Sequence, residues 1–180
     1  MNKKKWYILN IIGTDKTGIV AAITKILTAN NCNLGQTNMA RLGGAFCIMM
    51  MVRSDYNQQD LTEKLEQTAD KLDLFLHINE IDDSNGSNHK NKEKPANIHL
   101  GVYGADRSGI IADTTFILAQ HNFNITDLYS DLTKSAENPL YILNIYGRCS
   151  QKIEIIEQDL KKNLPKNIEF SLKNIETEIY

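Results

Sequence analysis

The chain has 180 residues, 42% of them hydrophobic and 23% charged, which is enough apolar material to bury a core in one domain or in two small ones. Its 20 Lys and Arg residues nearly balance its 22 Asp and Glu residues, so it lacks the positive excess that nucleic-acid binders direct at phosphates, and we expect no direct nucleic-acid contact. No window approaches the roughly 18 uncharged apolar residues of a membrane span, and no signal-peptide core follows residues 1–5, so we expect a cytoplasmic protein without membrane contact.

The first half of the chain predicts four strands and two helices. Tyr7, Leu9 and Ile11 alternate with their neighbours as in a strand, whereas Ile19 and Ile23 begin the three- and four-residue spacing of an amphipathic helix. The predicted elements are a strand around 7–11, a helix over 19–27, strands over 33–41 and 46–52 joined by Gly43-Gly44, a helix over 61–72 and a strand over 74–81.

The second half repeats this order after a polar segment. Residues 82–95 have no apolar periodicity and are rich in Asn, Ser and Lys, so we expect a first domain over 1–82, a linker over 83–96 and a second domain over 97–180. The second set of elements is a strand over 98–103, a helix over 109–121, strands over 125–132 and 140–147, a helix over 153–164 closed by Pro165, and a strand over 168–175.

An internal duplication supports the two domains. Ten of the 22 residues over 13–34 are identical to the residues 91 positions later, without a gap. The order βαββαβ, occurring twice, predicts an α+β protein of two ferredoxin-like domains, each an antiparallel four-stranded sheet with two helices on one face. This fold alone does not define a function.

The loop before the first helix of each copy is a candidate site for an anion. Thr17 and Ser108 stand where a helix N-cap is expected, and each precedes a glycine that lets a ligand approach the backbone. The first-turn amides and the helix dipole favour a carboxylate there. An alternative remains open, because Asp-x-x-Gly before a helix is also common as pure turn chemistry.

Two further residues of each copy suit an α-amino acid. Asp15 and Asp106 are placed to receive an ammonium group or to fold the loop through their own backbone contacts. Asn33 and Asn124 begin the next strand, and an amide side chain donates to a carboxylate and accepts from an ammonium group. Together, loop and asparagine predict an amino-acid site.

The pattern Gly-x-Asp-x-x-Gly-Ile, followed by Asn-x-Asn-(Leu/Ile) in a βαββαβ frame, resembles the ACT domain. Two such units in a chain of this size resemble the glycine cleavage system transcriptional repressor family. The resemblance implies a regulatory protein that binds a small amino acid between paired ACT units. Carried over by position, the ligand-binding residues are Asp15, Gly18, Ile19 and Asn33 in the first unit and Asp106, Gly109, Ile110 and Asn124 in the second.

The same resemblance implies the partners. It names glycine as the first ligand to test, a DNA-binding transcription regulator as the protein partner, and a homo-oligomer as the assembly. One departure is the longer connection over 133–139 in the second unit, so the two units need not both bind ligand. The alternatives are a ligand-free interaction module and, less favoured, a regulatory subunit of an amino-acid or one-carbon enzyme.

Cysteines and histidines indicate no metal, cofactor or catalytic centre. Cys32, Cys47 and Cys149 form no close pair, and we expect reduced, mostly buried thiols. The four histidines are scattered over both units and the linker: His77, His89, His99 and His121. Neither repeated motif contains a histidine and no catalytic domain follows the second unit, so we expect a protein that is not an enzyme.

Strand phase predicts an apolar interface on the first unit. Projecting the alternation of the second unit back onto the first leaves five apolar residues on the sheet face away from the helices. The expected interface residues are Trp6, Ile8, Phe46, Ile48 and Met50. A contiguous apolar sheet face is seldom left in water, so we expect a second copy, the second unit or the partner protein to cover it. An error of one residue in strand phase would exchange the two faces.

Overall fold

The structure is a computed structural model that describes residues 4–81, 95–133 and 139–175. The chain divides into two compact units, Met1–Asn91 and Lys92–Tyr180, each of which is described by itself. The expected linker, except for residues 95 and 96, and most of the connection over 133–139 lie outside the described residues.

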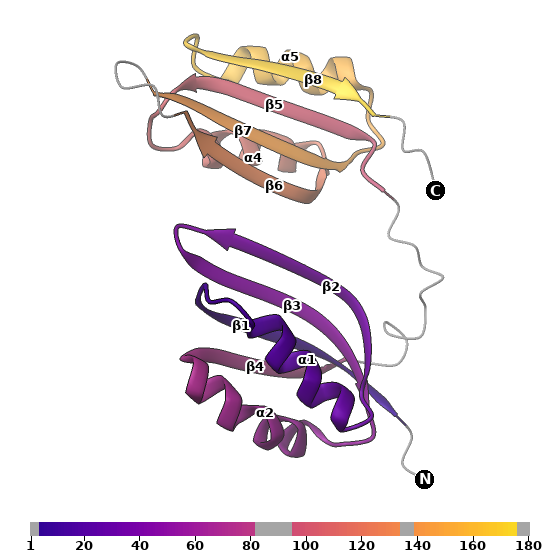
Figure 1. Cartoon of the computed structure of the whole chain (residues 1–180). Helices are drawn as coiled ribbons and strands as arrows, with labels where there is room; N and C mark the ends of the chain where they lie inside the picture. The colour runs from indigo at the N-terminus through magenta and orange to yellow at the C-terminus, as the bar shows by residue number, and fades with distance from the viewer. Residues whose placement is uncertain (1–3, 82–94, 134–138, 176–180) are drawn as a thin grey trace. The chain divides into compact units, whose positions relative to one another are not determined.

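Unit one has the predicted βαββαβ order, with both helices on one face of a four-stranded sheet (Figure 1). Its elements are β1 (Lys5–Thr14), α1 (Ile19–Ala29), β2 (Asn33–Leu42), β3 (Ala45–Ser54), α2 (Gln58–Leu72) and β4 (Leu74–Ile81). The sheet order is β2-β3-β1-β4, and the register confirms antiparallel pairing throughout. Strand β2 is therefore an edge strand.

Unit two repeats the architecture, with sheet order β6-β7-β5-β8. Its elements are β5 (Ile98–Ala105), α4 (Ile110–Gln120), β6 (Asn124–Leu132), β7 (Leu140–Arg148), α5 (Ile153–Asn163) and β8 (Ile168–Asn174). The prediction of an α+β protein with two ferredoxin-like units is confirmed.

Local chemistry accounts for the ends of α2. Asn57 Oδ1 accepts a hydrogen bond from the Asp60 amide at 2.9 Å, so a side chain caps the first turn of this helix. Asp73 ends α2 in the left-handed conformation, with φ of 57°, and turns the chain directly into β4. Leu61 and Leu65 on the inner side of α2 are buried against the sheet.

The expectation that Phe46, Ile48 and Met50 face away from the helices is wrong. In the register of β1 and β3, Leu9 lies opposite Met50 and Ile11 lies opposite Ile48. Leu9 and Ile11 are fully buried in the core between sheet and helices, and the three β3 residues are buried with them. These three residues therefore belong to the core and not to an interface.

The cause is a shift of one residue in the correspondence between the two units. Met50 pairs with Leu9, and Ile145 pairs with Leu100, so equivalent positions on these strands are 95 residues apart. The expectation used a separation of 94 residues. Because strand side chains alternate with a period of two, this single residue moved the whole strand to the other face.

Trp6 and Ile8 lie on the open face, as expected, since they alternate with Tyr7 and Leu9 of the core. Trp6 is nevertheless only 8% exposed. The guanidinium carbon of Arg53 lies 5.9 Å from its ring centroid, and a Cβ at Gly35 would lie 3.1 Å from the ring. Trp6 is therefore largely buried, which leaves little of its ring for an external contact.

The three cysteines are free thiols, two of them buried and one exposed. Cys32 donates to Ser54 Oγ at 3.4 Å and Cys149 donates to the His121 carbonyl at 3.2 Å, so both are part of the packed interior. Cys47 lies on β3 between the buried Phe46 and Ile48, and its side chain is on the open face.

Over the described residues, no helix is long and apolar enough to cross a membrane. Nor do three or more His, Cys, Asp or Glu side chains come together there in a way that would hold a metal ion.

Candidate ligand site

A hollow of about 330 Å³ lies where α1 begins in unit one. It is lined by the loop after β1, the first turn of α1 and neighbouring side chains of β2 and β3. The lining residues are Asp15, Lys16, Gly18, Ile19, Val20, Ala21, Met39, Arg41 and Phe46. Three of the predicted ligand residues, Asp15, Gly18 and Ile19, are therefore brought together.

The N-cap of α1 is Gly18, not Thr17. Gly18 has φ of 93°, a left-handed conformation that strongly favours glycine, and no side chain caps the helix. The first-turn amides of a helix have no partners within the helix, and α1 has no acidic residue in its first turn. The backbone that lines the hollow is therefore suited to an external anion.

A charge pair lies beside this helix start. Arg41 Nη2 on β2 is 2.6 Å from Asp15 Oδ2 in the loop, and the two side chains are 67% and 26% exposed. The Asp15 amide also donates to the Gly44 carbonyl at 3.0 Å, which ties the loop to the β2–β3 turn. The hollow thus has a paired positive and negative side chain in its lining, with Lys16 as a second cation.

The equivalent helix start in unit two differs in one respect. Gly109 caps α4 with φ of 94°, which likewise replaces the expected Ser108. Asp113, however, stands in the first turn of α4, with its carboxylate beside Gly109. Arg107 Nη2 donates to Asp113 Oδ2 at 2.7 Å. In unit two the protein supplies its own carboxylate at this position, and Asp106 is exposed.

The structure does not bring the asparagines to these loops within a unit. Asn33 lies opposite Arg53, which lies opposite Trp6, whereas the hollow adjoins Thr14 at the other end of β1. Eight residues of strand separate the two ends, about 26 Å. Asn124, opposite Arg148, has the same placement at the start of β6.

Sequence reasoning missed two features of this region. Arg41 was counted only as the end of a strand, although the hairpin register predicts that it returns to the end of the sheet where the loop lies. The second feature is the contrast at equivalent positions 22 and 113, Ala in unit one and Asp in unit two. The gapless repeat contains this difference, so it was available as a signal.

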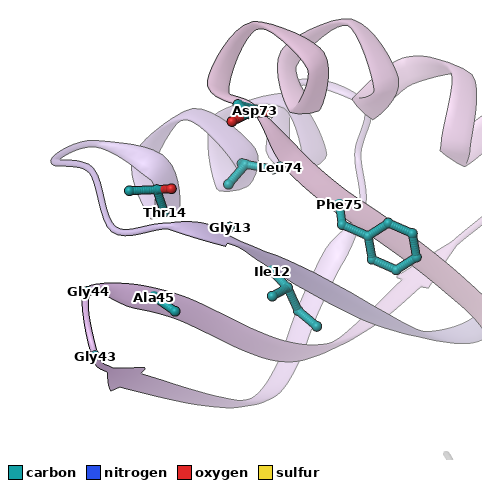
Figure 2. Close-up of a pocket in the computed structure, with 9 residues that line it drawn as sticks. All are labelled: Ile12, Gly13, Thr14, Gly43, Gly44, Ala45, Asp73, Leu74 and Phe75. Carbon is teal, nitrogen blue, oxygen red and sulfur yellow. The ribbon is translucent and has the colours of Figure 1, made fainter.

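A second hollow in unit one lies at the same end of the sheet (Figure 2). It is lined by the ends of β1, β3 and β4 and by the glycine turn. The lining residues are Ile12, Gly13, Thr14, Gly43, Gly44, Ala45, Asp73, Leu74 and Phe75. Among the described residues of this lining, Asp73 is the single charged side chain and there is no cation, so this hollow is less suited than the first to a zwitterion.

The two βαββαβ units, each with a glycine-opened helix at one end of its sheet, define a tandem ferredoxin-like α+β protein. A family model described as the ACT domain matches residues 6–79. UPF0237 protein MJ1558 of Methanocaldococcus jannaschii is 30% identical over 78 residues, which cover 42% of this chain and 87% of that protein. The chain belongs to the ACT-domain family.

The chain is also similar to relatives over both units. The glycine cleavage system transcriptional repressor of Escherichia coli is 27% identical over 139 residues, which cover 77% of this chain and 70% of the repressor. The crystal structure of an unknown protein from Galdieria sulphuraria has a TM-score of 0.76 at 19% identity, and the match covers 96% of this chain and 99% of that one. At this identity, the likeness to the Galdieria structure shows a shared fold alone.

Proposed function

We propose that this ACT-domain protein is an amino-acid-sensing regulator that binds a small amino acid at the start of α1. The observation that carries the proposal is the uncapped first turn of α1, which lines a hollow together with the Arg41–Asp15 charge pair. The ligand carboxylate would accept from the first-turn amides and from Arg41, and its ammonium group would donate to Asp15.

The size of the hollow is consistent with such a ligand. Its volume of about 330 Å³ is at the lower end of the range for small-molecule sites. Glycine has about five heavy atoms, and a ceiling of about 1.5 kcal/mol per atom allows roughly 7.5 kcal/mol of binding free energy at best. Sensing of glycine at micromolar to millimolar concentration is therefore feasible.

A second copy of the chain would complete the site with Asn33. Strand β2 is the edge of its sheet, and its start and end lie at opposite ends of the unit. Antiparallel pairing of two β2 strands in register would place Asn33 of one copy level with Arg41 and Leu42 of the other. The amide of Asn33 would then donate to the carboxylate that Arg41 binds.

Regulation of transcription through a DNA-binding partner is the output we propose. Its support is the likeness to a protein named as a transcriptional repressor, together with a net charge of −2, which does not favour direct binding to DNA. Gel shifts at physiological salt should show no specific DNA complex for the protein alone. A specific complex without any partner would contradict this output.

Calorimetry with glycine and a panel of small amino acids tests the binding proposal. We expect saturable binding of at least one of them to the full chain, with one binding site per chain. Absence of binding throughout the panel would favour the ligand-free interaction module, which uses the same fold but binds no amino acid.

A further inference from the structure

The open face of the unit-one sheet, on the side away from the helices, carries a surface that is uncharged and mostly apolar. Figure 2 shows Ile12 and Phe75 on neighbouring strands, and Ile12 lies opposite both Phe75 and Cys47 in the sheet register. Ala40 lies opposite Cys47 on the edge strand, which completes a row across all four strands. Phe75 is 66% exposed and Ile12 is 45% exposed.

The neighbouring rows of this face are also free of charge. Four consecutive rows contain no Asp, Glu, Lys or Arg, and they include Met49, which is 48% exposed, and Leu42, which is 81% exposed. In strand order from β2 to β4 the rows are Leu42, Ala45 and Thr14; Ala40, Cys47, Ile12 and Phe75; Asn38, Met49, Asn10 and His77; and Met51, Ile8 and Asn79. We call these residues the open-face patch.

We propose that the open-face patch binds the same patch of a second copy of the chain. An isologous contact sets a surface against itself, so the uncharged rows meet uncharged rows, while the Asp73 carboxylate lies beside the patch in the hollow that Thr14 and Phe75 line. The open face of unit two has different chemistry, since its rows include Asp127, Lys173 and Glu169. A charged partner would lose hydration on the open-face patch without gaining an ion pair, which disfavours it as the occupant.

The area of the patch indicates how strongly two copies should associate. Seven residues of β1 span about 23 Å and four strands span about 19 Å, so the footprint is roughly 400 Å². A standard interface takes about 800 Å² from each partner, so we expect a weak dimer whose population depends on protein concentration. The contact is separate from the amino-acid site, because the patch lies on the other face of the sheet from α1.

Cys47 provides a direct probe, because it is the exposed cysteine of the three and lies within the patch. The experiment measures the rate at which iodoacetamide labels Cys47 in the full chain, by peptide mass spectrometry, as protein concentration rises through the micromolar range. If only the monomer reacts, the rate falls about tenfold once about nine tenths of the chain is dimeric. Buried Cys32 and Cys149 report whether the fold stays intact.

Phe75→Gln should remove the protection, and Phe116→Gln should keep it. Phe116 on α4 is 67% exposed against 66% for Phe75, so the two variants remove the same exposed ring from different surfaces. Glutamine is uncharged, so neither variant adds a charge to the surface. Phe75→Gln should also leave glycine binding intact, and Asn33→Ala should leave Cys47 protection intact, so this contact and the proposed ligand site are tested independently.

Three outcomes would overturn the proposal. A fast labelling rate at every concentration would mean that the patch stays uncovered. A slow rate at every concentration would mean that the chain covers its own patch. Equal loss of protection in Phe75→Gln and Phe116→Gln would place the contact elsewhere.

Discussion

Positions 22 and 113 are equivalent in the two units, and they differ in charge at the two helix starts. Asp113 stands beside Gly109 in α4, whereas Ala22 leaves the first turn of α1 without an acidic residue. We expect Ala22→Asp to lower amino-acid affinity at least tenfold, because a like charge close to the ligand carboxylate opposes binding. Calorimetry against the wild-type chain measures the change.

Asp113→Ala is the matched control for Ala22→Asp. It should leave the affinity of unit one unchanged, since it alters only α4. Equal effects of the two substitutions, or none from Ala22→Asp, would contradict the assignment of the site to unit one.

Tyr7 links a buried hydroxyl to stability. Its hydroxyl donates to the Tyr56 carbonyl at 2.8 Å, and the ring is fully buried. Tyr7→Phe should lower the free energy of unfolding by about 1–3 kcal/mol at neutral pH, because the carbonyl loses its partner. Urea denaturation of both proteins measures this difference.

The same residue predicts a pH dependence. Burial raises the pKa of Tyr7 above its ordinary value of 10.0, so the unfolded chain releases this proton at lower pH than the folded protein. Stability from Tyr7 is present at neutral pH and is lost as pH rises above about 10. Between neutral pH and about pH 11, Tyr7→Phe should therefore lose less stability than the wild type. A parallel decline of both proteins would contradict this reasoning.

Substitutions in strand β3 can test which side of this strand faces the core. Ile48 and its neighbour Met49 are both apolar, but Ile48 is 3% exposed and Met49 is 48% exposed. We expect Ile48→Ser to lower the free energy of unfolding by about 2–5 kcal/mol and Met49→Ser by less than about 1 kcal/mol. Denaturant titration of the two variants measures both values. A larger loss for Met49→Ser than for Ile48→Ser would mean that Met49 faces the core, as first expected from the sequence.

Sequence pattern predicted these elements well but not every face. The alternation over 45–54 is apolar on both sides, from Phe46 and Ile48 to Met49 and Met51, so hydrophobicity alone could not choose the buried side. The buried side of this strand was therefore chosen by comparison with unit two, and the connection before the strand has a different length in the two units. Similarly, the N-cap of α1 was placed one residue early, at Thr17, because the left-handed conformation of Gly18 is set by the backbone and not by a capping side chain.

For the whole molecule, duplication was the strongest signal in the sequence. The gapless identities over 13–34 predicted two units of one fold, and both sheets have the expected order. The structure brings only some of the expected ligand residues together. The loop residues Asp15 and Gly18 lie together, but Asn33 is at the far end of the sheet, which a list of motif positions within one unit does not reveal.

The central claim is that unit one binds an amino-acid carboxylate at the start of α1. The most direct measurement is a two-dimensional ¹⁵N–¹H NMR titration of the full chain with glycine. We predict saturable shifts of the Gly18, Ile19 and Val20 amides, while the equivalent amides of Gly109 and Ile110 stay in place. Unchanged Gly18 and Ile19 amides at saturating glycine and at saturating levels of each amino acid in the panel, or shifts confined to Gly109 and Ile110, would contradict the account.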